Sequence, residues 1–343
     1  MGDSVSPTSP DSAADDATPT GDPEFEAWVQ GRLQTIERAL LDAALADSDF
    51  VSEASQHIIR SGGKRFRPLL VVLAACCGDP DRPASDAEVD LAALVVELTH
   101  VGSLYHDDVM DEAELRRGAP SANNRWQNSV AILTGDLLFS KASEIVADLG
   151  PEFVRLQAVT FSRLVQGQLA ETVGPADGVG KVDHYLKVVA DKTGALIATS
   201  ALFGAKVAHA TPEVQAALAA YGEEIGAVFQ LSDDIIDITS DDTGKTPGTD
   251  LREGVETLPT LLVRQHARPD DAELIALMDS DLSDADALAR AVAALRQHPA
   301  IDLARSEVGR RAEAARAHLA VLPDGPAKRA LDALCTTVVT RTA

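Results

Sequence analysis

The segment Leu104-Tyr105-His106-Asp107-Asp108-Val109-Met110-Asp111 ends an apolar run with helical spacing and places three carboxylates at i, i+1 and i+4. A second segment, Gln230-Leu231-Ser232-Asp233-Asp234-Ile235-Ile236-Asp237, repeats this arrangement. Because residues four and three apart share a helix face, each segment is expected to gather its acids on one patch. Two unit charges ~5 Å apart at an effective dielectric of about 20 repel by roughly 3 kcal/mol. Six acids in two such clusters therefore predict a positive partner between them.

The two acid triplets offer oxygen ligands without a Cys or His metal-binding spacing, which favours a hard cation. Mg²⁺ is the first choice, and in proteins it usually keeps several waters and shares itself with substrate phosphates. The sequence therefore predicts a diphosphate held through Mg²⁺ between two acidic helices. The alternative is two solvated acidic helix ends, and the pairing of two such motifs makes it the weaker interpretation.

The composition narrows the class of protein. The 343 residues are 45% hydrophobic and only 4% aromatic, which is typical of a globular protein that favours helices over sheets. The net charge of −24 argues against nucleic acid and against an anionic membrane surface as partners. We expect no signal peptide and no transmembrane segment. Cys76, Cys77 and Cys335 show neither metal spacing nor a disulfide framework, which indicates a cytoplasmic protein.

The chain divides into a tail and one predicted domain. Residues 1–23 contain no Lys or Arg, and we predict a disordered acidic tail there. Residues 24–343 are predicted to form one all-α domain, without a convincing strand pattern. A Gly-, Asp- and Thr-rich loop over 240–256 is predicted to be a mobile lid. Before it, helices are expected over Pro23–Ala46, Val51–Arg60, Leu69–Cys77, Ala87–Val109 (with Asp86 as cap), Asn123–Leu149, Pro151–Val173, Val182–Val207 and Pro212–Ile238.

Clusters of cations stand out in so acidic a chain. Gly62-Gly63-Lys64-Arg65-Phe66-Arg67-Pro68 combines three cations with two glycines, which let a backbone approach an anion closely. Arg116-Arg117-Gly118 follows the first triplet, and Lys192-Thr193-Gly194 lies within a predicted helix. The basic turn and the two arginines are candidates for binding phosphate oxygens. Taken alone, the first is more commonly an exposed basic turn, and the alternative for the arginines is a pair of ordinary ion pairs.

In their order along the chain, these motifs resemble those of the trans (E-type) isoprenyl diphosphate synthases, over roughly residues 25–340. The resemblance implies an antiparallel helical bundle around a deep central cavity, and a homodimer. It implies a prenyltransferase that joins isopentenyl diphosphate head to tail to an allylic prenyl diphosphate, with Mg²⁺ as cofactor.

The resemblance also assigns roles to residues. The triplets are expected to hold up to three Mg²⁺ ions that bridge to the allylic diphosphate: Asp107, Asp108, Asp111, Asp233, Asp234 and Asp237. The same diphosphate is expected to contact Arg116, Lys192 and Lys245. Isopentenyl diphosphate is expected to bind Lys64, Arg67, His100 and Arg117, with Thr193 and Gln230 at the reacting centre. Many family members carry a lysine where this chain has Val255, and Arg252 or Lys245 is the candidate replacement.

Product length is predicted from the turn before the first triplet. Related enzymes with short products carry bulky side chains four or five residues before the first Asp, where this chain has Ser103 and Gly102. One helical turn, ~5.4 Å, is about one isoprene unit long, so small residues here predict a product of about six or more units. Such chains serve as quinone tails and imply peripheral membrane contact on release. The alternatives are a farnesyl or geranylgeranyl diphosphate synthase, a subunit of a heteromeric synthase, and a terpene cyclase or head-to-head enzyme.

Overall fold

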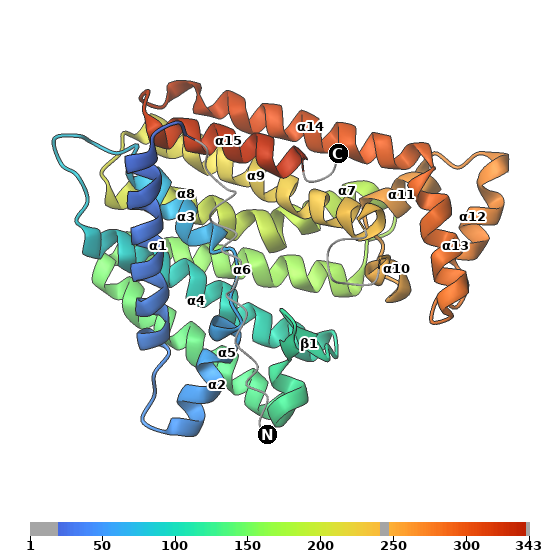
Figure 1. Cartoon of the computed structure of the whole chain (residues 1–343), viewed down its shortest axis with the longest axis horizontal. Helices are drawn as coiled ribbons and strands as arrows, with labels where there is room; N and C mark the ends of the chain where they lie inside the picture. Colours follow the sequence, from blue (N-terminus) through green and yellow to red (C-terminus); the bar gives the residue numbers. More distant parts are fainter. Residues whose placement is uncertain (1–19, 241–246, 341–343) are drawn as a thin grey trace, which may run out of the picture.

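The computed structural model describes residues 20–240 and 247–340, and they form a bundle of α-helices (Figure 1). The prediction of an all-α fold is confirmed. The predicted acidic tail, residues 1–23, lies almost wholly in residues 1–19, which are outside the described residues. Lys245 is also outside the described residues. The first helices are α1 (Pro23–Ala43), α2 (Asp49–Arg60), α3 (Phe66–Ala75), α4 (Asp86–Met110), α5 (Ala122–Leu149) and α6 (Pro151–Val173). The later ones are α7 (Lys181–Val189), the π-helix η1 (Ala190–Gly194), α8 (Ala195–Val207), α9 (Pro212–Thr239), α10 (Thr249–Arg252), α11 (Leu258–Gln265), α12 (Ala272–Met278), α13 (Ala285–Arg296), α14 (Pro299–His318) and α15 (Pro326–Thr340), with the 3₁₀ turns η2 (Pro269–Asp271) and η3 (Leu319–Val321).

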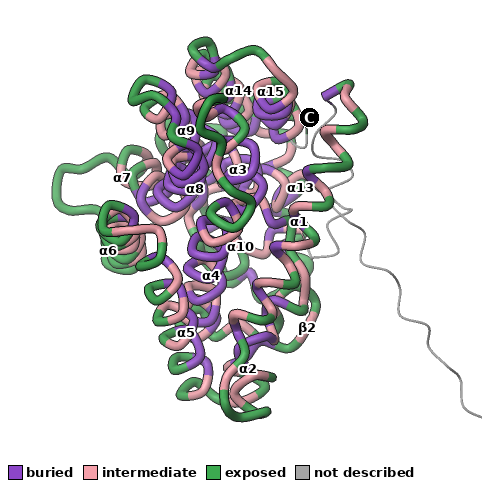
Figure 2. The backbone as a smooth tube through the Cα atoms, turned by 90° about the vertical axis from the view of Figure 1, so that its left-hand side faces the viewer, coloured by how far each residue is buried: buried purple, intermediate pink, exposed green. Residues whose placement is uncertain are grey.

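The two helices that carry the acid triplets are held in place by α8. Helix α8 packs against α4, α3 and α9, while α4 packs against α5 on its other side. Figure 2 shows the buried residues concentrated along α3, α4, α8 and α9, with α6 at the outer edge. Both triplets lie at the C-terminal ends of their helices, so this core brings them into the same part of the molecule.

Local signals set the start of the helix that carries the first triplet. The Ser85 hydroxyl accepts a hydrogen bond from the Glu88 backbone N–H, and the Glu88 carboxylate accepts one from Ser85 N–H in return. This capping box satisfies two of the free N–H groups at the helix start. The prediction that Asp86 caps the helix is wrong by one residue, because Asp86 is the first helical residue.

The basic loop after the first triplet forms a short hairpin, which the sequence did not predict. Strands β1 (Leu115–Arg116) and β2 (Ala119–Pro120) pair antiparallel. Arg117 and Gly118 between them have φ of 52° and 77°, as in a type I′ turn. Each strand has only two residues, which are too few to show the alternation of polar and apolar residues that predicts a strand. The hairpin fixes the two arginines beside the end of α4.

One apolar stretch, Lys181–Val207, is long and apolar enough to cross a membrane by length and composition. However, 72% of its most apolar window is buried inside the protein, as in the core helix of a globular fold. The stretch was predicted as one helix, with Gly194 as a point of close packing or a kink. It is in fact interrupted by the π-helical turn Ala190–Gly194, a feature often found at functional sites.

Candidate active site

A cavity of about 780 Å³ lies between the C-terminal parts of α4 and α9. Its walls also come from the basic turn before α3, the β1–β2 hairpin and η1. It collects most of the residues that the sequence singled out, from positions far apart in the chain. They are Lys64, Arg67, His100, Ser103, Asp107, Arg116, Arg117, Lys192, Thr193, Gln230, Asp233, Asp234 and Asp237. Asp108, Asp111 and Gly102 are not among the lining residues.

Adjacent acids of the first triplet have different surroundings. Asp107 lines the cavity, whereas Asp108 is fully buried and accepts a hydrogen bond from Arg116 Nε at 2.6 Å. The second carboxylate oxygen of Asp108 has no hydrogen-bond partner among the described residues. Burial raises the pKa of Asp107 to about 6, with Lys192 opposing the shift and Asp111 adding to it. Burial thus disfavours the ionised form of Asp107, and nearby positive charge favours it.

The second triplet is tied to its neighbours by hydrogen bonds. Asp234 accepts hydrogen bonds from the Tyr185 hydroxyl and from Gln230 Nε2, the latter at 3.2 Å. Burial raises the pKa of Asp234 to about 7. The carboxylate oxygens of Asp237 accept from the backbone N–H groups of Thr249 and Asp250, at 3.2 and 3.3 Å. No signal in the sequence singles out Tyr185, because it lies 49 residues from its partner.

The acids are suited to a cation that arrives with a ligand. Among the described residues, no three acidic, histidine or cysteine side chains are gathered closely enough to hold a metal ion by themselves. The cavity nevertheless presents carboxylate oxygens from two helices, and the raised pKa of Asp107 shows that added positive charge would stabilise its ionised form. Mg²⁺ commonly binds through one or two carboxylates plus substrate phosphates, so this donor set fits it.

Basic residues also line the cavity. Burial lowers the pKa of the Arg67 guanidinium to about 10, and its Nε has no hydrogen-bond partner in the described structure. The pKa of His100 lies well below its usual range, because the ring is buried and Arg67 and Arg117 add positive charge. Arg117 donates to the carbonyls of Ile58 and Gly62, which ties the hairpin to the basic turn. A bound anionic group would offset the repulsion between these clustered positive charges.

The π-turn presents two polar side chains to the cavity. Lys192 Nζ lies 2.5 Å from Glu171 Oε2, and Thr193 Oγ1 donates to Gln230 Oε1 at 3.3 Å. A Cβ on Gly167 would lie 2.6 Å from the Lys192 backbone nitrogen. Only glycine at that position of α6 therefore lets the π-turn come so close.

The two residues predicted to control product length face different neighbours. Ser103 lines the cavity. A Cβ on Gly102 would meet the Phe139 ring at 3.1 Å and the Gly135 carbonyl oxygen at 3.2 Å. Gly102 thus serves the close crossing of α4 and α5.

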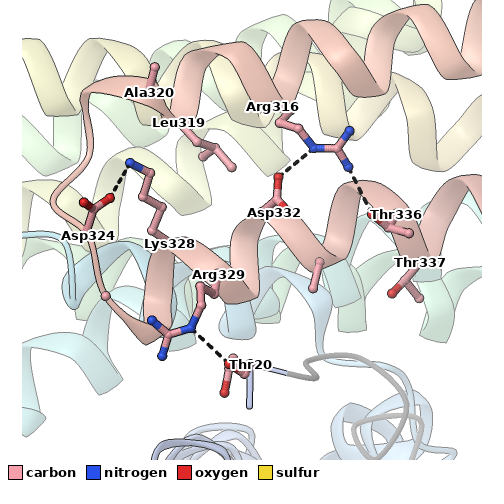
Figure 3. A pocket seen from close by; sticks show the side chains of 12 residues that line it. Thr20, Arg316, Leu319, Ala320, Asp324, Lys328, Arg329, Asp332, Thr336 and Thr337 are labelled. Carbon is pink, nitrogen blue, oxygen red and sulfur yellow. Dashed lines mark hydrogen bonds and ion pairs between the residues drawn. The ribbon is translucent and has the colours of Figure 1, made fainter. Parts of the chain in front are cut away.

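A second cavity of about 720 Å³ lies elsewhere, along α14 and α15 (Figure 3). Its charged groups already have partners: Lys328 pairs with Asp324, Arg316 pairs with Asp332, and Arg329 donates to the Thr20 carbonyl. It contains none of the motifs that the sequence singled out. The first cavity is therefore the candidate active site.

A family model described as Polyprenyl synthetase matches residues 48–295, which is more than half of the chain. The chain belongs to the polyprenyl synthetase family. Over 325 residues it is 46% identical to nonaprenyl diphosphate synthase of Mycobacterium tuberculosis, covering 94% of this chain and 96% of that protein. It is 31% identical to octaprenyl diphosphate synthase of Escherichia coli, covering 89% and 94%.

Solved structures agree with the family assignment. Geranylgeranyl pyrophosphate synthase from Corynebacterium glutamicum, complexed with calcium and isoprenyl diphosphate, matches with a TM-score of 0.84 and 43% identity. The match covers 94% of this chain and 98% of that one. The resemblance inferred from the motifs is confirmed, and the chain is a prenyl-transferring enzyme.

Proposed function

We propose that this enzyme extends an allylic prenyl diphosphate with isopentenyl diphosphate, head to tail, to make a long-chain all-trans polyprenyl diphosphate. The observation that carries the proposal is that one cavity is lined both by acids of the two triplets and by a group of cations. Lys192 and Arg116 lie near enough to Asp107 to oppose the rise of its pKa on burial. Arg67 and Arg117 lie near enough to His100 to add to the lowering of its pKa by burial. Two diphosphates, one held with metal beside the acids and one held by cations alone, suit this lining.

The residues account for the steps of such a condensation. Breaking the allylic C–O bond leaves negative charge on the diphosphate, which Arg116 and Lys192 are placed to stabilise. Mg²⁺ bound with that diphosphate supplies further positive charge, and cavity-lining carboxylates such as Asp107 and Asp233 would hold it. The isopentenyl double bond attacks the allylic carbon, and the proton lost from the new cation passes to the released diphosphate. Leu104 and other apolar side chains of the cavity wall exclude water from the cation.

The long-chain assignment is supported by a small residue and by relatives. Ser103, a small residue four positions before Asp107, lines the cavity. The relatives with long-chain names include the nonaprenyl and octaprenyl diphosphate synthases. The match to a geranylgeranyl pyrophosphate synthase favours a shorter product as the second candidate. We propose a quinone side chain as the use of a long product, and the cytoplasm as the place of synthesis, with membrane contact on release.

We also propose that the enzyme works as a homodimer. Val165, Leu169 and Val173 follow one another at i, i+4 spacing on α6 and are exposed, as is Leu133 on α5. An uncovered apolar stripe of this kind favours an interface with a second copy. Sedimentation of the purified chain tests this. A dimer that Leu169→Glu converts to monomer supports it, and a wild-type monomer at micromolar concentration contradicts it.

The activity is tested with the purified chain, Mg²⁺, farnesyl diphosphate and labelled isopentenyl diphosphate, followed by chromatography of the dephosphorylated product. We expect an all-trans product of about six or more isoprene units, set by an open cavity, and no product when EDTA replaces Mg²⁺. A product that stops at four units would replace the long-chain assignment with the geranylgeranyl one. If no labelled isopentenyl diphosphate is incorporated, the proposal is refuted, because the purified chain would then have no activity by itself.

A further inference from the structure

Arg65 differs from the other two cations of the basic turn in where its guanidinium lies. Its Nε and Nη2 donate to the two carboxylate oxygens of Glu37, at 2.5 and 2.7 Å. Its Nη1 donates to Glu97 at 3.0 Å, and Nη2 also donates to the Ile59 carbonyl at 2.8 Å. The side chain is only 8% exposed. With four hydrogen bonds to protein groups, Arg65 has little capacity left for a substrate phosphate.

The backbone at Arg65 is also unusual. Its φ of 46° and ψ of 37° place it in the left-handed region, which costs a residue with a Cβ free energy. Arg65 occupies the position just before the first residue of α3. The ion pairs of its side chain with α1 and α4 therefore hold the turn in a conformation that it would not otherwise prefer.

Because the Arg65 ion pairs hold the turn, they also affect the residues near Arg65 in the chain. Lys64 and Arg67 lie on either side of it in the chain and line the cavity, as do Arg65 and Glu97 themselves. The Glu97 carboxylate, itself 2% exposed, also stabilises the charged form of Arg67. Glu37, in contrast, lies on α1, is 35% exposed and does not line the cavity.

We propose that Glu37, Arg65 and Glu97 form a positioning cluster that fixes the direction of Lys64 and Arg67 toward the isopentenyl diphosphate. This inference rests on the proposed function, which assigns that substrate to the cations that line the cavity. Arg65 acts through its neighbours and does not contact the reacting atoms. Loss of the cluster should weaken binding of isopentenyl diphosphate alone, because the allylic diphosphate is held by other residues.

Glu37→Gln is the most informative variant. Removing Arg65 would leave Glu97 buried without a partner, and the chain could then fail to fold. Glu37→Gln keeps the shape of the side chain and leaves the Arg65–Glu97 pair in place. We expect KM for isopentenyl diphosphate to rise roughly tenfold, the effect of losing one charge-assisted pair, with KM for farnesyl diphosphate unchanged. Glu37→Asp, which restores the charge, should recover part of the loss.

The chain offers a matched control. Arg32 pairs with Asp90, so this pair also joins α1 to α4, but neither residue lines the cavity. Asp90→Asn removes the negative charge of this α1–α4 pair in the same way and should change neither KM. If Glu37→Gln behaves like Asp90→Asn, or raises both KM values equally, the cluster only stabilises the fold and the proposal is overturned.

A binding measurement separates this proposal from the proposed reaction. Calorimetric titration with isopentenyl diphosphate, without Mg²⁺ or an allylic substrate, should show the same roughly tenfold weakening in Glu37→Gln. If the wild type binds isopentenyl diphosphate but forms no product, the proposed reaction fails and the positioning role stands. If the wild type binds it and Arg67→Gln binds it equally well, the basic turn is not its site and the positioning role fails.

Discussion

Arg116 Nε donates a hydrogen bond to Asp108 Oδ1 at 2.6 Å, so the second acid of the first triplet is bound to the hairpin. Asp107, one residue earlier, lines the cavity instead. We expect Asp107→Asn to lower kcat roughly 100-fold or more and to raise the Mg²⁺ concentration needed for half-maximal rate, because a charged ligand is lost. Initial rates over a series of Mg²⁺ concentrations provide the measurement.

Asp108→Asn should behave differently, because its main effect is on Arg116. We expect KM for the allylic substrate to rise about tenfold, with the Mg²⁺ requirement unchanged, since one charge-assisted pair is lost. If Asp108→Asn raises the Mg²⁺ requirement as much as Asp107→Asn does, then Asp108 also binds the metal, as the family resemblance implied.

The raised pKa of Asp107 predicts a pH-dependent stability difference. Burial raises this pKa from 3.8 to about 6. The folded chain thus holds the proton more tightly than the unfolded chain. The stability from this group is complete below pH 4 and is lost as the pH rises through 6. Asn cannot ionise, so at pH 8 in EDTA Asp107→Asn should be more stable than the wild type by about 1–3 kcal/mol.

Thermal unfolding between pH 4 and pH 8 tests this prediction. The difference between Asp107→Asn and the wild type should shrink toward zero as the pH falls to 4. Asp148→Asn, at an exposed position of α5, is the control and should show no such trend. A variant that is less stable than the wild type throughout would mean that the Asp107 carboxylate makes a stabilising contact.

Ser103→Phe should shorten the product. Ser103 lines the cavity on the turn of α4 before Asp107, so a phenyl ring there would block about one isoprene unit of length or more. The first condensation should remain within about threefold of the wild-type rate, because no charged contact is lost. Chromatography of the products is the measurement, with Ser306→Phe at an exposed position of α14 as control. An unchanged product would place the end of the growing chain elsewhere.

The close contact of Gly167 in α6 with the π-turn predicts that Gly167→Ala lowers stability, although helix propensity alone predicts that it raises stability. Ala normally stabilises a helix interior by about 1 kcal/mol over Gly. Gly167→Ala should instead destabilise the fold by about 1–3 kcal/mol, because the added Cβ would lie 2.6 Å from the Lys192 backbone nitrogen. Turnover should fall with it, as Lys192 is displaced.

Gly309→Ala in α14 is the matched control for this contact. Nothing lies within 4 Å of a Cβ at Gly309, so the same substitution should stabilise the fold there by about 0.5–1 kcal/mol. Urea denaturation of both variants gives the comparison. A stabilised Gly167→Ala would show that α6 and the π-turn are less closely packed than the structure has them.

Local signals made many element boundaries predictable. Helix α6 runs from Pro151 to Val173, as predicted, because proline is favoured in the first turn of a helix and Gly174, with φ of 81°, ends it. The π-turn was beyond the reach of such signals. A Cβ on Gly226 of α9 would lie 2.8 Å from Gly194 Cα, so the distortion accompanies a contact between segments about thirty residues apart.

Long-range partners were likewise invisible in the sequence. Tyr185 donates to Asp234, and Arg65 pairs with Glu37 and Glu97. The sequence did not indicate which groups the Arg65 side chain contacts. In the structure it is only 8% exposed and donates hydrogen bonds to Glu37, Glu97 and the Ile59 carbonyl. Periodicity gives the face of a helix on which a residue lies, but it does not say what packs against that face.

By itself, the sequence determined an all-helical chain, two acid triplets at helix ends, and the basic residues that an anion requires. Composition and short-range spacing carry that information, because they act within a few residues. Only the tertiary structure decided that Asp107 lines the cavity while Asp108 is buried against Arg116. Successive residues on a helix point about 100° apart, so packing between distant helices selects which of two adjacent acids reaches the substrate.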